Sequence, residues 1–193
     1  MAAPAPGAEA PVSALPVELP GRQPRPAAVL CAVFDDDGQA AVVLTRRSSR
    51  LRSHTSEVSF PGGRLDDGEA PASAALREAW EEVGIAPGSV ELIGQLHPLT
   101  TPLNPAPIMP FVGVLDAAPA LSPNPAEVER AFTVTLAELF RPGVYHDEVW
   151  SDQRFGGDRV MCFFRLEGDI VWGATARMLR DLLDRMWATT VRG

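Results

Sequence analysis

Short apolar runs separated by turn-forming residues indicate that the first half of the chain is rich in β-strands. Residues 27–34 form an apolar run that ends at an Asp-Asp-Asp-Gly turn, and residues 40–45 form the next run. Two apolar runs joined by a tight polar turn predict a β-hairpin. Further runs predict strands at residues 57–60, 90–96, 108–115 and 160–166.

A helical period follows the first strands. Over residues 70–83, alanine and valine recur every three or four positions, Pro71 stands in the first turn and Gly84 follows the last. This combination predicts a helix. A second apolar helical face predicts a helix over residues 173–186, and residues 127–140 predict one or two short helical segments.

Strands and helices mix along the chain without a regular βαβ order, a repeat or a second domain boundary. The sequence therefore predicts one α/β domain with a mixed sheet. Residues 1–25 are rich in Ala, Pro and Gly and lack periodicity, which predicts a flexible tail.

The composition indicates the compartment of the protein and excludes some classes of partner. A net charge of −8 disfavours a broad nucleic-acid surface. No stretch approaches the roughly 20 apolar residues of a membrane span, and no basic run before an apolar block marks a secretory leader. The expected compartment is therefore the cytoplasm. Cys31 and Cys162 lie in apolar runs, which predicts buried thiols rather than disulfides.

The basic residues are all arginine, and four of the 17 fall within seven positions: Arg46, Arg47, Arg50 and Arg52. Planar guanidinium groups suit phosphate oxygens, so this cluster is a candidate phosphate-binding segment. A solvated strand edge and loop explains the same charges equally well on charge alone.

Three glutamates share one face near the end of the predicted helix. Glu78, Glu81 and Glu82 are related by helical spacing, and Arg77 is the only basic residue in that helix. Like charges at this spacing cost roughly 0.2–0.5 kcal/mol per pair. Hard divalent cations would compensate for them. From spacing alone, a solvated acidic face remains the alternative.

The wider pattern favours the metal interpretation. Gly63, Glu69 and the run Arg77-Glu78-Ala79-Trp80-Glu81-Glu82-Val83-Gly84-Ile85 stand at set spacing. This segment resembles the Nudix box at every position. The resemblance implies the Nudix fold, in which a mixed β-sheet is sandwiched between helices (α/β/α), and a metal-dependent hydrolase that cleaves a diphosphate linkage with Mg²⁺ or Mn²⁺.

The resemblance also assigns roles to individual residues. Glu78, Glu81 and Glu82 match the metal ligands, and the carbonyl of Gly62 matches a backbone ligand. Arg77 matches the residue that orients the glutamates. The supporting positions are Glu69 and Gly63.

The general base has two locations in relatives, inside the box or on a later loop. Glu81 is the candidate inside the box. Glu127 and Glu129 are the loop candidates, and Glu127 is preferred because it immediately follows a turn. Each loop glutamate is equally explained as an ordinary acidic residue at the start of a helix.

The residues that flank the box indicate the substrate. They resemble the signature of coenzyme A diphosphatases, which yield adenosine 3′,5′-bisphosphate and 4′-phosphopantetheine. The matching positions upstream are Leu44, Thr45, Arg47, Ser48, Arg52, Phe60, Pro61, Gly62 and Gly63. Ser56 departs from the usual glycine, which leaves the fit of the substrate open. Downstream, the resemblance continues through Trp172, which is expected in the core.

The resemblance predicts a Nudix domain over residues 26–187 and a short C-terminal tail at 188–193. It implies a small-molecule nucleotide substrate of the coenzyme A class or its acyl derivatives. Its relatives often form homodimers, although no residue pattern here demands one. The alternatives are a Nudix hydrolase of ADP-ribose or another nucleoside diphosphate derivative, and a non-catalytic Nudix ligand-binding module.

Overall fold

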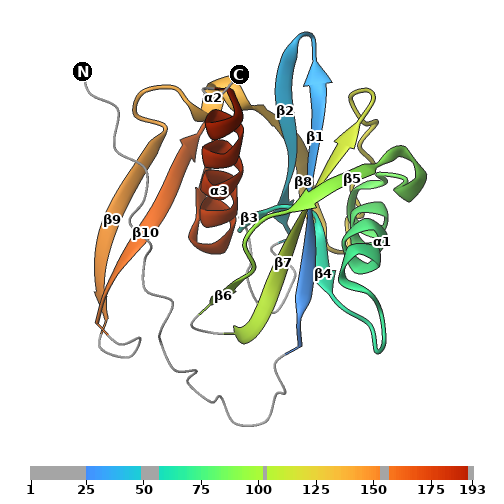
Figure 1. The fold of residues 1–193 in the computed structure, drawn as a ribbon, viewed down its shortest axis with the longest axis horizontal. Coiled ribbons are helices and arrows are strands. Elements are labelled where there is room, and N and C mark those ends of the chain that lie inside the picture. The colour runs from blue at the N-terminus through green and yellow to red at the C-terminus, as the bar shows by residue number, and fades with distance from the viewer. Residues whose placement is uncertain (1–24, 49–56, 102–103, 153–156, 191–193) are drawn as a thin grey trace.

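The computed structural model describes residues 25–48, 57–101, 104–152 and 157–190. It contains an eight-stranded sheet, a three-stranded sheet and helices on both faces of the larger sheet (Figure 1). The strands of the larger sheet are β1 (Ala27–Asp36), β2 (Gln39–Arg47), β3 (Val58–Ser59), β4 (Gly62–Arg64), β5 (Glu91–Gln95), β6 (Leu99–Thr101), β7 (Asn104–Leu115) and β8 (Val128–Thr135). The smaller sheet consists of β9 (Tyr145–Asp152), β10 (Gly157–Leu166) and β11 (Asp169–Trp172). The helices are α1 (Pro71–Val83), α2 (Leu136–Leu139) and α3 (Gly173–Thr190), with a short 3-10 turn, η1, at Pro87–Ser89.

The larger sheet is mixed, and its strands β1 and β2 separate beyond the hairpin that joins them. β1 runs parallel to β7 and antiparallel to β2, but the pairing with β2 extends only from the hairpin turn to Val33 opposite Val42. Beyond that point, β3 pairs with β2 and β4 pairs with β1. The segment that leads into α1 is therefore inserted between two diverging central strands.

Alternation along β1 divides the core into two layers. Ala28, Leu30 and Ala32 point to the layer that α1 covers, while Val29 and Cys31 point to the layer that contains α3 and the smaller sheet. All five are buried. A strand buried on both faces explains the continuous apolar run, and the predicted arrangement of a mixed sheet between helices is confirmed.

The helix predicted at residues 70–83 is confirmed as α1, with boundaries set by its terminal residues. Pro71 takes the first helical position, where its missing N–H costs no hydrogen bond. Gly84 adopts a left-handed conformation (φ 78°) and donates its N–H to the carbonyl of Trp80 at 2.9 Å. Both cysteines are buried and free, as predicted. None of the helices within the described ranges is long and apolar enough to cross a membrane.

Three predictions need correction. Residues 127–140 are mostly a strand, β8, because residues 128–135 pair with β2, and Phe132 and Val134 pack in the core layer that contains α3; only α2 is helical. The partly polar strand β9 and the short strand β11 were not predicted at all, since tertiary pairing with β10 forms them. The last helix, predicted over residues 173–186, continues to Thr190.

Candidate active site

Glu82 is the most deeply buried acid of the predicted site, at 1% exposure. Helix α1 directs its carboxylate into the split between β1 and β2. There Oε2 accepts a hydrogen bond from the backbone N–H of Gly62 at 3.0 Å, and Oε1 accepts one from Nη1 of Arg47 at 3.3 Å. The predicted metal ligand and one predicted phosphate-binding arginine therefore lie in direct contact.

Two glycines of β4 allow it to lie close to β1 and to the carboxylate of Glu78. A Cβ atom at Gly62 would lie 2.4 Å from the carbonyl oxygen of Ala28, and one at Gly63 would lie 2.4 Å from the carboxyl carbon of Glu78. The carboxylate of Glu78 thus lies directly against Gly63. Both acids therefore meet β4: Glu78 lies against Gly63, where no side chain blocks it, and Glu82 accepts the N–H of Gly62.

Arg77 joins the remaining acids of the helix. Its Nε and Nη2 each donate to Glu69 at 2.8 Å, while Nη1 donates to Glu78 and to Glu81 at 3.0 Å. The hydrogen bonds from Arg77 lower the pKa of Glu69 to about 2, assisted by a bond from the N–H of Asp66. One guanidinium therefore fixes three carboxylates, as the resemblance implied for an orienting residue.

The C-terminal end of α1 positions the loop that carries Glu127. The backbone N–H groups of Ser122 and Asn124 donate to the carbonyls of Val83 and Glu82, at 2.9 and 2.8 Å. Farther along, the carbonyl of Glu127 accepts the N–H of Ser48 at 2.8 Å. These bonds were not predicted from the sequence, although the prolines around residue 124 indicated a loop.

The site concentrates negative charge. Burial raises the pKa of Glu82 to about 7; Gly62 and Arg47 oppose this shift, and the charges of Glu78 and Glu127 add to it. Burial also raises the pKa of Glu78, against the effect of Arg77, and Glu81 and Glu127 again contribute. The preferred base candidate is thus close enough to both buried acids to repel them, and a cation would relieve this repulsion.

The other predicted arginines stand apart from this cluster. Arg46 projects from the opposite side of β2, where Nη1 lies 3.3 Å from Oδ1 of Asp169 and Nε lies 3.8 Å from Glu129. Asp169 also contacts Arg130. Arg50 and Arg52, and Ser56, lie outside the described residues. The structure therefore places Arg47, and not Arg46, beside the acids of α1.

The donor set fits a hard divalent cation by its chemistry. Across the described part of the chain, no three His, Cys, Asp or Glu side chains already form a metal-ligand group. The reason is that Arg77 engages Glu78 and Glu81, while Arg47 and Gly62 engage Glu82. These carboxylates are nevertheless adjacent, partly buried and short of positive charge, which suits Mg²⁺ or Mn²⁺.

Replacing Arg77 by lysine is expected to lower kcat about 10- to 100-fold, the cost typical of losing an orienting partner of a metal ligand. An ammonium group cannot bond to three carboxylates in the geometry of the planar fork. Steady-state hydrolysis of a nucleoside diphosphate substrate measures the loss. Arg64→Lys is the matched control, since the Arg64 side chain is exposed and only its carbonyl contacts Arg77. Equal activity of both variants would contradict the orienting role.

Residues 24–155 match the NUDIX domain family. A Photorhabdus laumondii protein described as an uncharacterized Nudix hydrolase NudL is 37% identical over 163 residues, which cover 84% of this chain and 85% of that protein. A Citrobacter koseri protein with the same description is 38% identical over 160 residues, covering 82% of this chain and 81% of its own length.

Solved structures with a similar fold are more distant in sequence. A C. elegans Ap4A hydrolase in a binary complex superimposes with a TM-score of 0.51 at 20% identity, covering 59% of this chain and 82% of that one. The NUDIX domain of Shewanella oneidensis NrtR, complexed with ADP ribose, gives 0.51 at 18% identity and covers 61% and 77%. At this identity the likeness concerns the fold alone.

Proposed function

The chain belongs to the Nudix family of hydrolases acting on phosphorus anhydrides, and from this premise we propose its substrate. The proposed substrate is coenzyme A or an acyl derivative, and the products are adenosine 3′,5′-bisphosphate and 4′-phosphopantetheine or its acylated form. The observation that carries the proposal is the contact between Arg47, from the coenzyme A-type signature, and Glu82, from the Nudix box.

The metal requirement is part of the proposal. Nudix hydrolases generally use divalent ions such as Mg²⁺ or Mn²⁺. Glu78, Glu81 and Glu82 would hold such ions, together with the carbonyl of Gly62. When bound, they would neutralise the diphosphate and activate a water.

The other side chains of the site orient the carboxylates and bind the phosphate oxygens. Arg77 keeps the carboxylates in one orientation through its fork of hydrogen bonds. Arg47 provides a fixed positive charge at the entrance of the cluster, where a diphosphate oxygen competes with Glu82 for its Nη1 donor. Arg50 and Arg52 are proposed to bind the other phosphate oxygens. Since the charge that develops in the transition state lies on these oxygens, fixed donors lower the barrier.

Glu127 is proposed to accept the proton of the attacking water. The loop that carries it is bonded to the end of α1 through the N–H of Asn124 and the carbonyl of Glu82, and the charge of Glu127 contributes to the raised pKa of Glu78 and of Glu82. Glu81 is the alternative, but its carboxylate already accepts a hydrogen bond from Nη1 of Arg77 at 3.0 Å. A loop base would also leave the helix acids free for the cations.

Replacing Glu127 by glutamine is expected to lower kcat about 10²- to 10⁴-fold with little change in KM, because the base is lost and the shape is kept. Glu129→Gln is the paired variant and is expected to lose far less, since the carboxylate of Glu129 faces Arg46 instead. Rates under saturating Mg²⁺ compare the two. A larger loss in Glu129→Gln than in Glu127→Gln, or a rate in Glu127→Gln close to that of the wild type, would contradict Glu127 as the base.

Product analysis tests the substrate. The purified chain is incubated with coenzyme A, octanoyl-coenzyme A or ADP-ribose, each with Mg²⁺ or Mn²⁺, and the products are separated by chromatography. Adenosine 3′,5′-bisphosphate should form faster from the coenzyme A substrates than AMP forms from ADP-ribose. Cleavage of ADP-ribose alone would retain the diphosphatase activity but refute the proposed substrate class.

A further inference from the structure

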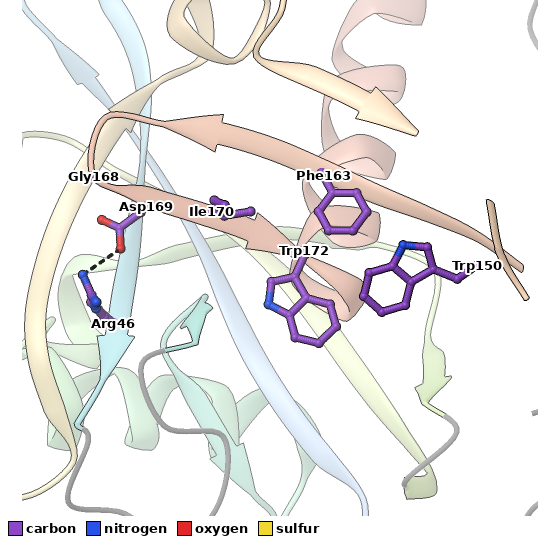
Figure 2. A pocket seen from close by; sticks show the side chains of 7 residues that line it. All are labelled: Arg46, Trp150, Phe163, Gly168, Asp169, Ile170 and Trp172. Carbon is purple, nitrogen blue, oxygen red and sulfur yellow. Dashed lines mark hydrogen bonds and ion pairs between the residues drawn. The ribbon is translucent and has the colours of Figure 1, made fainter. Parts of the chain in front are cut away.

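A second feature lies on the other side of β2 from the glutamate cluster. A cavity of about 400 Å³ opens between Arg46 and the smaller sheet, within the size range of small-molecule sites. Figure 2 shows Trp150, Phe163 and Trp172 on the same side of that sheet, from β9, β10 and β11. Ile170 and Asp169 complete the wall toward Arg46.

The aromatic wall is apolar, exposed and held in place. Trp150 and Trp172 are 46% and 39% exposed, so the expectation that Trp172 lies in the core was wrong. Trp150 packs against Phe163, with ring centroids 5.8 Å apart. Its Nε1 donates to Glu148 at 2.9 Å, and Glu148 is 3.0 Å from Nε2 of His146. Exposed tryptophans fixed in this way provide a preformed apolar surface.

The geometry of the two indoles excludes a planar ring between them. Their centroids are 6.0 Å apart and their planes are inclined by 32°. A nucleobase stacked between two rings needs about 3.5 Å on each side and nearly parallel planes. These rings instead contact each other and form a continuous floor, which suits a flexible chain lying across it.

The charges of the cavity are balanced. Arg46 is paired with Asp169 and Glu129, and Arg130 also contacts Asp169. Asp169 is buried, at 8% exposure, while the side chains of Arg46, Arg130 and Glu129 are partly exposed around it. Two positive and two negative groups leave no net charge to attract a phosphate. The cavity therefore suits an uncharged part of a ligand.

Adjacent residues at the end of β2 belong to the cavity and to the glutamate cluster. Arg46 and Arg47 are the last two residues of β2; one lines the cavity and the other contacts Glu82. In addition, β11 lies against β3, whose end at Ser59 is followed closely by Gly62. A ligand that places its diphosphate beside Arg47 and its other end on the tryptophans would therefore cross the end of β2.

We propose that this cavity binds the uncharged arm of the substrate, which for coenzyme A is the pantetheine chain with the acyl group on its sulfur. The inference rests on the proposed function and adds a second contact region to it. Arg46 then contributes to substrate binding by lining this region, while Arg47 meets the diphosphate. The tryptophans favour acylated over free coenzyme A, because an acyl chain buries more of their exposed surface.

Calorimetric titration with S-octanoyl-pantetheine tests the site, because this probe has no diphosphate and cannot be hydrolysed at the metal cluster. We expect saturable binding to the full chain. The Kd should rise at least about tenfold in Trp172→Ala and in Ile170→Glu, the loss expected when an apolar contact surface is removed. Ile170 is 51% exposed, so the second variant should fold. Trp187→Ala is the matched control and should bind as the wild type does, because Trp187 is also an exposed tryptophan but packs on Phe140, away from the cavity.

The outcomes separate this inference from the proposed function. No binding of the probe, or equal binding by wild type and both variants, overturns the inference even if coenzyme A is hydrolysed. Binding that is lost in the variants supports the site even if coenzyme A proves not to be a substrate. Adenosine 3′,5′-bisphosphate is titrated in parallel; a loss of its affinity in Trp172→Ala would assign the cavity to the nucleotide and overturn the proposal.

Discussion

Replacing Glu82 by glutamine is expected to reduce hydrolysis at least about 10³-fold, the upper range for removing one charged group that acts on the transition state. Glutamine preserves the shape and can still accept the N–H of Gly62, but it lacks the negative charge that holds a divalent cation. Steady-state rates with Mg²⁺ measure the loss. Glu91→Gln, an exposed glutamate on β5, is the control and should retain wild-type rates.

The same substitution should stabilise the metal-free protein. The pKa of Glu82 is raised from 4.5 to about 7 in the fold, so the folded state binds more protons than the unfolded state between these values. The free energy of unfolding therefore falls as the pH rises from about 4.5 to about 7. Glutamine removes this dependence and should add roughly 1–3 kcal/mol above pH 7. Urea unfolding of both proteins in EDTA at pH 5 and pH 8 measures the free energies of unfolding. If Glu82→Gln keeps the pH dependence of the wild type, the raised pKa does not belong to Glu82.

Gly62→Ala is expected to destabilise the fold by roughly 2–4 kcal/mol, in the range of severe overpacking. The added Cβ would stand 2.4 Å from the carbonyl oxygen of Ala28 and 2.6 Å from Cα of Val29, and backbone atoms of a central strand cannot move aside cheaply. Urea unfolding measures the change. Gly88→Ala, with no atom within 4 Å of the new Cβ, is the control.

Gly63→Ala distinguishes stability from function at the adjacent position. Its Cβ would meet the carboxylate of Glu78, the mobile end of a side chain. The side chain can rotate away at a lower cost in stability than backbone atoms can move, but it then leaves β4 and its hydrogen bond with Arg77. Gly63→Ala should therefore lose activity more than stability, in contrast to Gly62→Ala. If Gly62→Ala instead unfolds at the same urea concentration as the wild type, Gly62 of β4 does not lie against the backbone of β1.

Local sequence signals predicted the elements that carry the glutamates. Helix α1 has Pro71 at its start, Gly84 at its end and a regular alanine stripe, all of which act over a few residues. By contrast, β9 has the polar sequence of a solvated loop and becomes a strand only because β10 pairs with it. Long-range pairing of this kind cannot be derived from the segment itself.

In the candidate site too, local signals were predicted from the sequence and contacts between distant segments were not. Spacing placed Glu78, Glu81 and Glu82 on one helical face, and the family pattern indicated Gly62 and Arg77. Which of two adjacent arginines meets Glu82 depended on the alternation of β2 and on its split from β1. The exposure of Trp172 depended on the smaller sheet, whose outer strands were not predicted. The residues that share one helix or one motif could thus be predicted from the sequence, whereas contacts between segments far apart in the chain could not.

The most direct test of the metal site is a crystal grown with Mn²⁺ and measured at the manganese absorption edge. We predict an anomalous peak between the carboxylates of Glu78 and Glu82 and the Gly62–Gly63 loop, and its absence from crystals of Glu82→Gln grown in the same way. A peak at another position, or one that persists unchanged in Glu82→Gln, would contradict the assignment of this cluster as the metal centre of the enzyme.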